Sequence, residues 1–170
     1  MHPVISNVSA MDDIIKKFDA AIEGIAVHAH PLPTEKSVSK IEEHFKIKLP
    51  KLLLQLAEHG KNFSSRFLSL GSDFESHSHI IRVNSYWRRR RRTKRVPENL
   101  VVLTQGWMDN RFWCLDCSAP DEHKSDYAIQ FWCPEKIFYA SESDRPPERY
   151  PDFRSFVEAD IYWADARNAG

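Results

Sequence analysis

The chain has 170 residues, of which 42% are apolar and 28% are charged, and these values are typical of a single globular domain. No apolar run approaches the roughly 18 residues that a membrane-spanning helix requires, and the N-terminus lacks the basic and apolar regions of a signal peptide. The cysteines Cys114, Cys117 and Cys133 are too few, and odd in number, for a disulfide framework. We therefore expect a cytoplasmic protein with no membrane segment.

The charge is unevenly distributed, although the formal net charge is zero. Seven of the 24 basic residues fall within the eight positions 88–95, and the rest of the chain carries 17 basic against 24 acidic residues, a net charge of −7. The sequence therefore predicts an acidic body with one basic loop, which any functional interpretation has to explain.

The first half of the chain has the pattern of three helices. Apolar residues recur at helical spacing over Met11–Gly24, which predicts the first helix. Thr34 is suited to cap a second helix, but Ser37 occupies the position at which a complete capping box has Glu or Gln. Pro50 fits the first turn of a third helix, and Gly60 fits the C′ position that ends it.

The second half is rich in short apolar and aromatic runs that predict strands. These runs lie at Phe67–Leu70, His79–Val83, Leu100–Leu103, Phe112–Asp116 and Tyr127–Trp132, with turn signals at Asp109-Asn110 and Pro120-Asp121. Bulky side chains point to both faces of the Phe112–Asp116 run, which predicts a central strand that is covered on at least one side.

The C-terminal part returns to helix. The proline-rich segment Arg145–Pro151 interrupts the strand pattern, and Phe153, Phe156 and Val157 begin a last helix that extends to about Ala166. The connections between strands are too short for crossovers, so we expect a mostly antiparallel sheet. Helices, then strands, then a closing helix predict an α+β fold with helices flanking the sheet.

Three stretches of the chain, in their order and spacing, resemble the SUKH superfamily, which contains the Smi/Knr-type cell-wall regulators and many bacterial toxin-immunity proteins. The first is IEEHFKIKLPKLLLQLAEHG (Ile41–Gly60), which resembles the family's helix, I-x-LP link, second helix and terminal glycine. The second is FLSL (Phe67–Leu70), and the third runs from VPENLVVLTQGWMDNRFWCLDC through YAIQFWCPE to DFRSFVE. The resemblance divides the chain into an N-terminal helical extension, 1–33, and a SUKH-like α+β domain, 34–170, that we expect to form one compact unit.

The resemblance implies a function as well as a fold. It implies a sheet flanked by helices that binds another protein, has no enzymatic site, and neutralises a cognate bacterial toxin, often a nuclease, by covering the toxin's active site. The same fold also suits a regulatory scaffold of the Smi/Knr kind that recruits signalling or wall-synthesis partners. The basic insertion at Trp87–Arg95 departs from the family's pattern and leaves the partner's identity open.

The residues themselves give little support for catalysis or metal binding. The chain has five glycines and no G-x-S-x-G, glycine-rich phosphate loop or H-E-x-x-H motif. The segment Cys114–Cys117 (C-L-D-C), with His123 and Cys133, contains zinc-ligand residue types, but a single C-x-x-C on a strand favours core packing over a metal site. The pairs in 28–30 and 77–79 (H-A-H and H-S-H) favour solvated surface histidines. We expect no catalytic residue, no metal and no cofactor.

The arginine run Arg88–Arg92 has three interpretations. Arginines can neutralise nucleic-acid phosphates while Tyr86 and Trp87 stack on bases, although the acidic remainder of the chain would repel a polyanion. The run can instead be an electrostatic docking loop for an acidic partner. The third interpretation is a solvated loop without a partner, which is the commonest role of charge runs.

The acidic residues offer a second candidate surface. Carboxylates near the turns of the C-terminal strands can mimic phosphates in front of the basic groove of a nuclease, although surface carboxylates also serve solubility alone. The candidate partner-binding residues are therefore Asp109, Asp116, Asp121, Glu122 and Asp126 on the acidic side, with Trp87, Arg89 and Arg91 on the basic side. The expected function is an immunity protein that occludes a protein toxin, with the regulatory scaffold and nucleic-acid binding through Arg88–Arg95 as alternatives.

Overall fold

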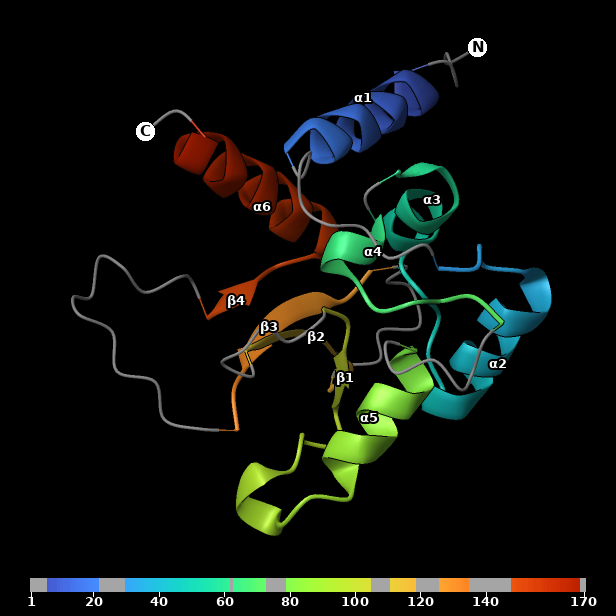
Figure 1. Ribbon diagram of the computed structural model, residues 1–170, viewed down its shortest axis with the longest axis vertical. Helices are drawn as coiled ribbons and strands as arrows, with labels where there is room; N and C mark the ends of the chain where they lie inside the picture. Colours follow the sequence, from blue (N-terminus) through green and yellow to red (C-terminus); the bar gives the residue numbers. More distant parts are fainter. Residues whose placement is uncertain are drawn as a thin grey trace.

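The structure is a computed structural model that describes residues 6–21, 30–61, 63–72, 79–104, 111–118, 126–134 and 148–168. Helices come first, then a strand-rich region, then a closing helix, which confirms the α+β class (Figure 1). The elements in chain order are α1 (Ser6–Ala21), α2 (Glu35–Phe45), α3 (Lys51–His59), α4 (Phe63–Arg66), α5 (Ile80–Arg88), the 3-10 turn η1 (Arg92–Lys94), β1 (Leu100–Val102), β2 (Phe112–Asp116), β3 (Ala128–Trp132), β4 (Arg149–Tyr150) and α6 (Phe153–Asn168).

The strands form one antiparallel sheet in the order β1-β2-β3-β4, as the short connections predict. In this register Cys114 of β2 pairs with Val102 of β1 on one side and with Gln130 of β3 on the other. The prediction that Phe112–Asp116 is a central strand is therefore confirmed. Since successive residues of a strand face opposite sides, Trp113 and Phe112 project from opposite faces of the sheet.

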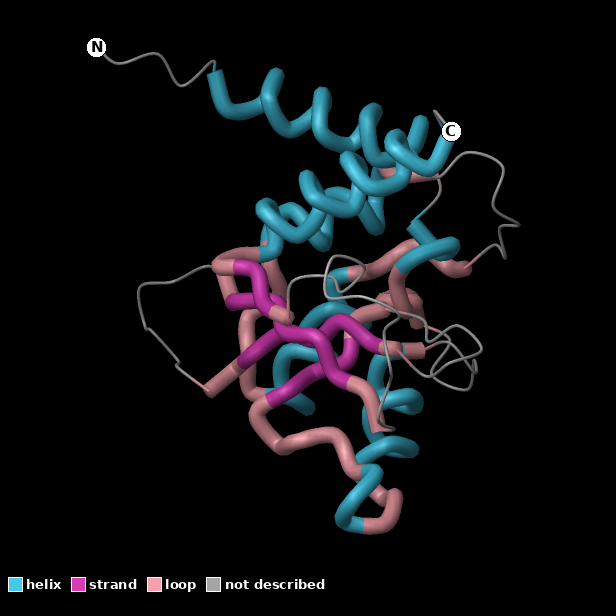
Figure 2. Tube along the Cα trace, turned by 90° about the vertical axis from the view of Figure 1, so that its left-hand side faces the viewer, coloured by secondary structure: helices cyan, strands magenta, loops and turns pink. Residues whose placement is uncertain are grey.

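Each face of the sheet meets a different helix. On one face the Trp113 ring lies 5.2 Å from the ring of Phe156 in α6. On the other face Trp87 of α5 contacts Phe112 and Trp132, with ring centroids 5.2 and 5.5 Å away. Figures 1 and 2 show α1 and α6 side by side at one end of the molecule, with α5 and η1 at the opposite end. The helix α6 therefore lies between the sheet and α1.

Phe67 lies at the centre of the core between the helices. Its ring centroid is 5.7 Å from that of Phe18 in α1, 5.1 Å from Phe63 in α4 and 5.7 Å from Phe153 in α6. Aromatic side chains bury large apolar areas, and stacked or tilted ring pairs add to this. One residue of the FLSL motif thus joins three helices that are far apart in the sequence.

The ends of two helices differ in detail from the prediction. The capping box at α2 is complete, because the Ser37 hydroxyl accepts a hydrogen bond from the Thr34 amide at 2.9 Å while Thr34 accepts from the Ser37 amide at 3.1 Å. A serine therefore serves where Glu or Gln was expected. Gly60 ends α3 with a φ of −76°, so it is not the left-handed cap that its position predicts. A Cβ at Gly60 would lie 2.5 Å from the Leu56 carbonyl oxygen, so close approach of the backbone favours glycine there.

Two of the predicted strands were wrong. His79–Val83 is the start of α5, because the His79 side chain caps the helix by accepting from the Ile81 amide at 3.2 Å, and Ile80 and Asn84 are buried one turn apart. The β-branched residues of this segment favour a strand, but the burial of one side of a helix outweighs that preference. Phe67–Leu70 is not a sheet strand either, since its bridges to other described residues, Phe67 to Thr104 and Ser69 to His79, are isolated.

The remaining differences concern element boundaries. The proline-rich segment does more than interrupt the pattern, since Arg149 and Tyr150 form β4 beside β3. The first helix begins at Ser6 instead of Met11, and its expected end at Gly24 lies outside the described residues. Both predicted turns, Asp109-Asn110 and Pro120-Asp121, also lie outside them. None of the described helices has the length and apolar character needed to cross a membrane.

Asn84 attaches α5 to the edge of the sheet. Its side-chain oxygen accepts from the Val102 amide at 2.8 Å, and its side-chain nitrogen donates to the carbonyl oxygens of Val102 at 3.0 Å and Ile80 at 2.9 Å. The side chain is fully buried, so this amide replaces the neighbouring strand that β1 would otherwise need. The orientation of α5 on the sheet depends on this contact and on Trp87.

We predict that Asn84→Ala lowers the free energy of unfolding by about 2–4 kcal/mol, because it leaves the buried amide and carbonyl of Val102 without partners. Urea unfolding followed by circular dichroism measures this loss. Ser85→Ala is the matched control on the same helix and should change stability by no more than about 0.5 kcal/mol. Equal effects of the two substitutions would contradict the role assigned to Asn84.

Candidate partner interface

The arginine-rich segment is held between two buried side chains. Trp87, on its N-terminal side, is 8% exposed, and Val96, on its C-terminal side, is fully buried. Between them α5 ends, and η1 closes a turn in which the Lys94 amide donates to the Arg91 carbonyl at 2.8 Å. The segment is therefore a short turn whose two flanking residues are buried in the core.

Two of the arginines contact their own chain. The Arg88 guanidinium lies 5.2 Å from the centre of the Phe45 ring in α2 and donates to the Leu100 carbonyl at 3.3 Å and the Glu98 carbonyl at 3.4 Å. The Arg90 guanidinium lies over the Tyr86 ring, 4.4 Å from its centre, and donates to the Tyr86 hydroxyl. Both contacts are of the cation–π kind, which stabilises a cation over an aromatic face. These arginines fasten the segment to α2, β1 and α5.

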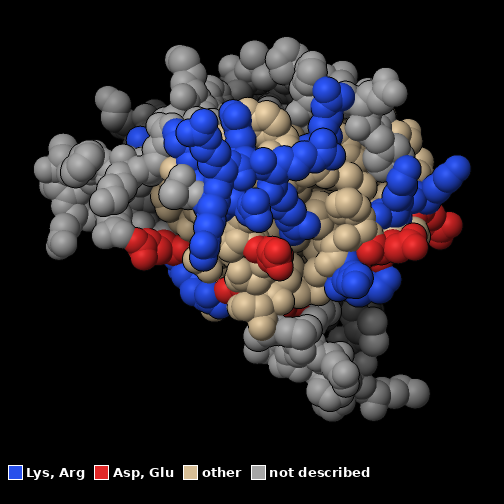
Figure 3. All heavy atoms as spheres, turned by 90° about the horizontal axis from the view of Figure 1, so that it is seen from below, with Lys and Arg blue, Asp and Glu red and all other residues tan. Residues whose placement is uncertain are grey.

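Apart from Arg88, the basic residues of the segment are exposed, and these include Arg90 despite its contact with Tyr86. We use the name cationic face for the six exposed residues Arg89, Arg90, Arg91, Arg92, Lys94 and Arg95. Figure 3, seen from the end of the molecule that holds α5 and η1, shows Lys and Arg side chains gathered across the middle of that surface. The side chains of Arg89, Arg91, Arg92 and Arg95 form no hydrogen bond or ion pair with any part of the chain that the structure describes.

In contrast to these arginines, the predicted acidic residues that the structure describes, Asp116 and Asp126, form hydrogen bonds within the chain. Asp116 is 6% exposed, and its carboxylate accepts from Arg149 at 2.6 Å, from the Asn99 side chain at 3.1 Å and from the Ser118 amide at 3.0 Å. Asp126 is half-buried and accepts from the Phe153 amide at 3.3 Å at the start of α6. The structure therefore gives both carboxylates intramolecular partners. Asp109, Asp121 and Glu122 lie outside the described residues.

The network around Asp116 favours its ionised form. Burial by itself raises the pKa of this carboxyl, but hydrogen bonds from Ser118, Asn99 and Arg149 outweigh burial and hold the pKa at about 2. Burial is also the main reason that the pKa of Asp126 is raised, although the Phe153 and Tyr127 amides act in the opposite direction. Asp116 is therefore an ionised, internally paired group that links β2 to β4.

The structure thus brings together only part of the predicted site. Arg89 and Arg91 are exposed on the cationic face, whereas Trp87 packs in the core against Phe112 and Trp132. Arg149, the partner of Asp116, was not predicted, because no local pattern indicates that β4 lies beside β3. The spacing of Ile80, Asn84 and Trp87 at i, i+4 and i+7 was the signal that would have placed Trp87 on the buried side of a helix.

Cys114, Cys117 and His79 lie in the core or pack against it. Cys114 is fully buried and burial raises its pKa well above the ordinary value, while burial raises the pKa of Cys117 to about 11. His79 is fully buried and hydrogen-bonds to the Gly71 carbonyl at 3.0 Å, so the expectation of a solvated histidine was wrong there. Among the described residues no group of three His, Cys, Asp or Glu side chains is placed to hold a metal ion. His123, His77 and His28 lie outside them.

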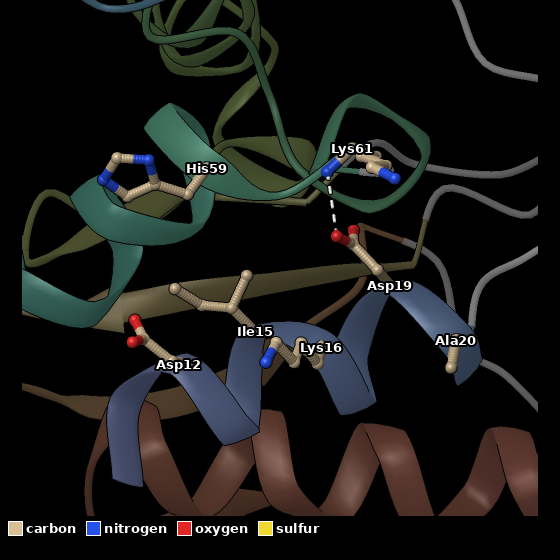
Figure 4. A pocket seen from close by; sticks show the side chains of 7 residues that line it. All are labelled: Asp12, Ile15, Lys16, Asp19, Ala20, His59 and Lys61. Carbon is tan, nitrogen blue, oxygen red and sulfur yellow. Dashed lines mark hydrogen bonds between the residues drawn. The ribbon is translucent and has the colours of Figure 1, made fainter. Parts of the chain in front are cut away.

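An open groove lies between α1 and α3, away from the cationic face. Figure 4 shows that its walls carry side chains of both signs, with the Lys61 amide donating to the Asp19 carboxylate at 3.0 Å. The lining residues are Asp12, Ile15, Lys16, Asp19, Ala20, His59 and Lys61. These mixed charges give no convergent set of groups that indicates a ligand.

Comparisons with known proteins identify a family for this chain. The family model SUKH_5, described as SMI1-KNR4 cell-wall, matches residues 11–163, and this match begins within α1. Among curated proteins none gives a significant match. A solved structure described as a protein from Pseudomonas syringae pv. tomato is 18% identical, with a TM-score of 0.49, and the alignment covers 72% of this chain and 83% of that one.

We predict that Asp116 contributes pH-dependent stability. Its folded pKa of about 2 lies below its ordinary value of 3.8, so the contribution is fully present above about pH 4 and is lost as the pH falls towards 2. The stability advantage of the wild type over Asp116→Asn should therefore shrink by roughly 2 kcal/mol between pH 5 and pH 2. Urea unfolding across this range tests the prediction, and a difference that stays constant with pH would contradict it.

A second prediction separates the two kinds of arginine. Arg88→Met keeps the apolar stem but loses the guanidinium contacts to Phe45 and the Leu100 carbonyl, so it should destabilise the fold by about 1–2 kcal/mol. Arg89→Met is the matched control, and its effect should stay within about 0.5 kcal/mol because its side chain faces solvent. Thermal or urea unfolding of both variants measures this. A greater loss with Arg89→Met would overturn the distinction.

Proposed function

Because the chain belongs to the SUKH family, we propose that it is an immunity protein, which binds a cognate bacterial toxin in the cytoplasm and blocks the toxin's active site. The observation that carries this proposal is the family match over residues 11–163. The family is not known for enzymatic activity, which supports binding as the mode of action. Inhibition by occlusion needs a stable surface of complementary shape and charge, and it needs no catalytic group in the inhibitor.

The geometry supports a binding role through the cationic face. Arg89, Arg91, Arg92 and Arg95 are exposed on a segment held by Trp87 and Val96. A charged surface on an ordered support loses less conformational entropy on binding than a mobile loop does. Such a surface also accelerates encounter with an oppositely charged partner.

A regulatory scaffold is the second candidate function, and the family's description as SMI1-KNR4 cell-wall favours it. In that role the same fold recruits signalling or wall-synthesis proteins. The gene neighbourhood separates the two functions, because a toxin gene directly upstream is expected for an immunity protein and is not required for a scaffold.

Nucleic-acid binding has weaker support than either. Of the two aromatic residues that would stack on bases, Trp87 is buried, and Tyr86, which is 50% exposed, has the Arg90 guanidinium over its ring. Base stacking on exposed rings is a principal source of affinity for single strands. The net charge of −7 outside residues 88–95 also opposes a long polyanion.

We predict that co-expression of this chain with the protein encoded immediately upstream of its gene rescues cell growth. Co-expression should also give a complex that survives size-exclusion chromatography, because occlusion requires a long-lived contact. The control is Leu56→Asp, which places a charge at a fully buried position of α3 and should abolish rescue by unfolding the domain. Cell death with the wild-type chain present, together with no complex, would refute the immunity function.

A further inference from the structure

We propose that Arg89, Arg91, Arg92 and Arg95 form a preorganised docking surface for an acidic patch on a protein, while Arg88 and Arg90 position that surface without contacting the partner. This inference rests on the proposed function, in which the partner is the cognate toxin. It divides a uniform run of arginines into two groups by what each side chain contacts.

The helix dipole explains only the first part of the run. Cations near a helix C-terminus are stabilised by the negative end of the helix, which accounts for Arg88, Arg89 and Arg90 at the end of α5. This effect falls off within the last turn. Arg91, Arg92 and Arg95 lie beyond it and form no ion pair with a described carboxylate, so no described contact within the chain uses their charge.

The segment is also more ordered than a solvated charge run requires. The residues at its two ends, Trp87 and Val96, are buried, and η1 forms the turn between them. Arg88, which is partly buried, adds contacts to α2 and β1. Fixing several like charges close together costs electrostatic free energy, which a partner of opposite charge would offset.

The size of the surface favours an acidic protein over nucleic acid. The cationic face is confined to residues 88–95, and the rest of the chain, with 17 basic and 24 acidic residues, has a net charge of −7. An extended nucleic acid would run past the cationic face onto the rest of the chain, which has no net positive charge to hold it, whereas an acidic patch on a protein can end where the cationic face ends. The Tyr86 ring that would stack on a base is covered on one face by Arg90.

The test compares two variants that lose the same number of charges. In the first, Arg89, Arg91, Arg92 and Arg95 are all replaced by Gln. In the control, the exposed lysines Lys16, Lys36, Lys51 and Lys61, on α1, α2, α3 and the turn after it, are replaced by Gln. Both variants change exposed residues, so each should retain the wild-type fold and stability, which circular dichroism and urea unfolding check.

The probe is the purified upstream-encoded toxin, and surface plasmon resonance measures association and dissociation at 50 and 300 mM NaCl. We expect the arginine variant to bind about 100-fold more weakly, chiefly through slower association, and to lose most of the salt dependence seen in the wild type. The control variant should bind within about threefold of the wild type. A labelled 20-base-pair DNA duplex, tested under the same conditions, should bind more weakly than the toxin and should not compete with it.

The outcomes distinguish this inference from the function on which it rests. If the wild type binds the toxin and the arginine variant binds equally well, the docking surface is wrong and the immunity function stands. If both variants weaken binding equally, general charge and not this face attracts the partner, and the inference fails. DNA that binds more tightly than the toxin and displaces it would replace the protein partner with nucleic acid. No binding of the toxin by the wild type contradicts both proposals.

Discussion

The position of α5 on the sheet depends on the side-chain amide of Asn84, which pairs with both backbone groups of Val102. An edge strand has unpaired amides and carbonyls, and burial makes each of them costly unless it finds a partner. Asn84 provides both partners in one side chain, and Trp87, one turn further along α5, packs against Phe112 and Trp132. Together these contacts determine the direction in which α5 ends and therefore where the arginine-rich segment leaves the core.

The charges of this protein are divided between internal and external roles. Asp116 with Arg149, and Asp160 with Arg66, form ion pairs that join elements distant in sequence, and burial on at least one side of each pair strengthens them relative to exposed pairs. The cationic face has the external role, since its charges are exposed and most of them have no described partner. A charge with a buried partner stabilises the fold, whereas an exposed charge without a partner remains available for binding.

Sequence reasoning succeeded where local pattern and tertiary structure agree. Strands β1, β2 and β3 and helix α6 were predicted to within a few residues, because their apolar residues have the period of the structure they form. It failed at His79–Val83, where β-branched residues favour a strand but a buried stripe and the His79 cap form a helix. Of the candidate partner-binding residues, Arg89 and Arg91 are exposed, whereas Trp87 is in the core and Asp116 is paired internally, since burial depends on neighbours that are remote in sequence.

The sequence by itself determined the α+β class, the family resemblance, and the concentration of seven cations within residues 88–95 against an acidic remainder. These properties depend on composition, periodicity and order, which can be read without coordinates. Only the tertiary structure decided which of those cations are engaged and which are exposed. That division depends on the Phe45 ring meeting Arg88, on the backbone of β1 lying within reach of the same guanidinium, and on Val96 being buried at the far end of the segment. The physical reason is that the free energy of a charge depends on the groups that surround it in space, and the fold brings those groups from distant parts of the chain.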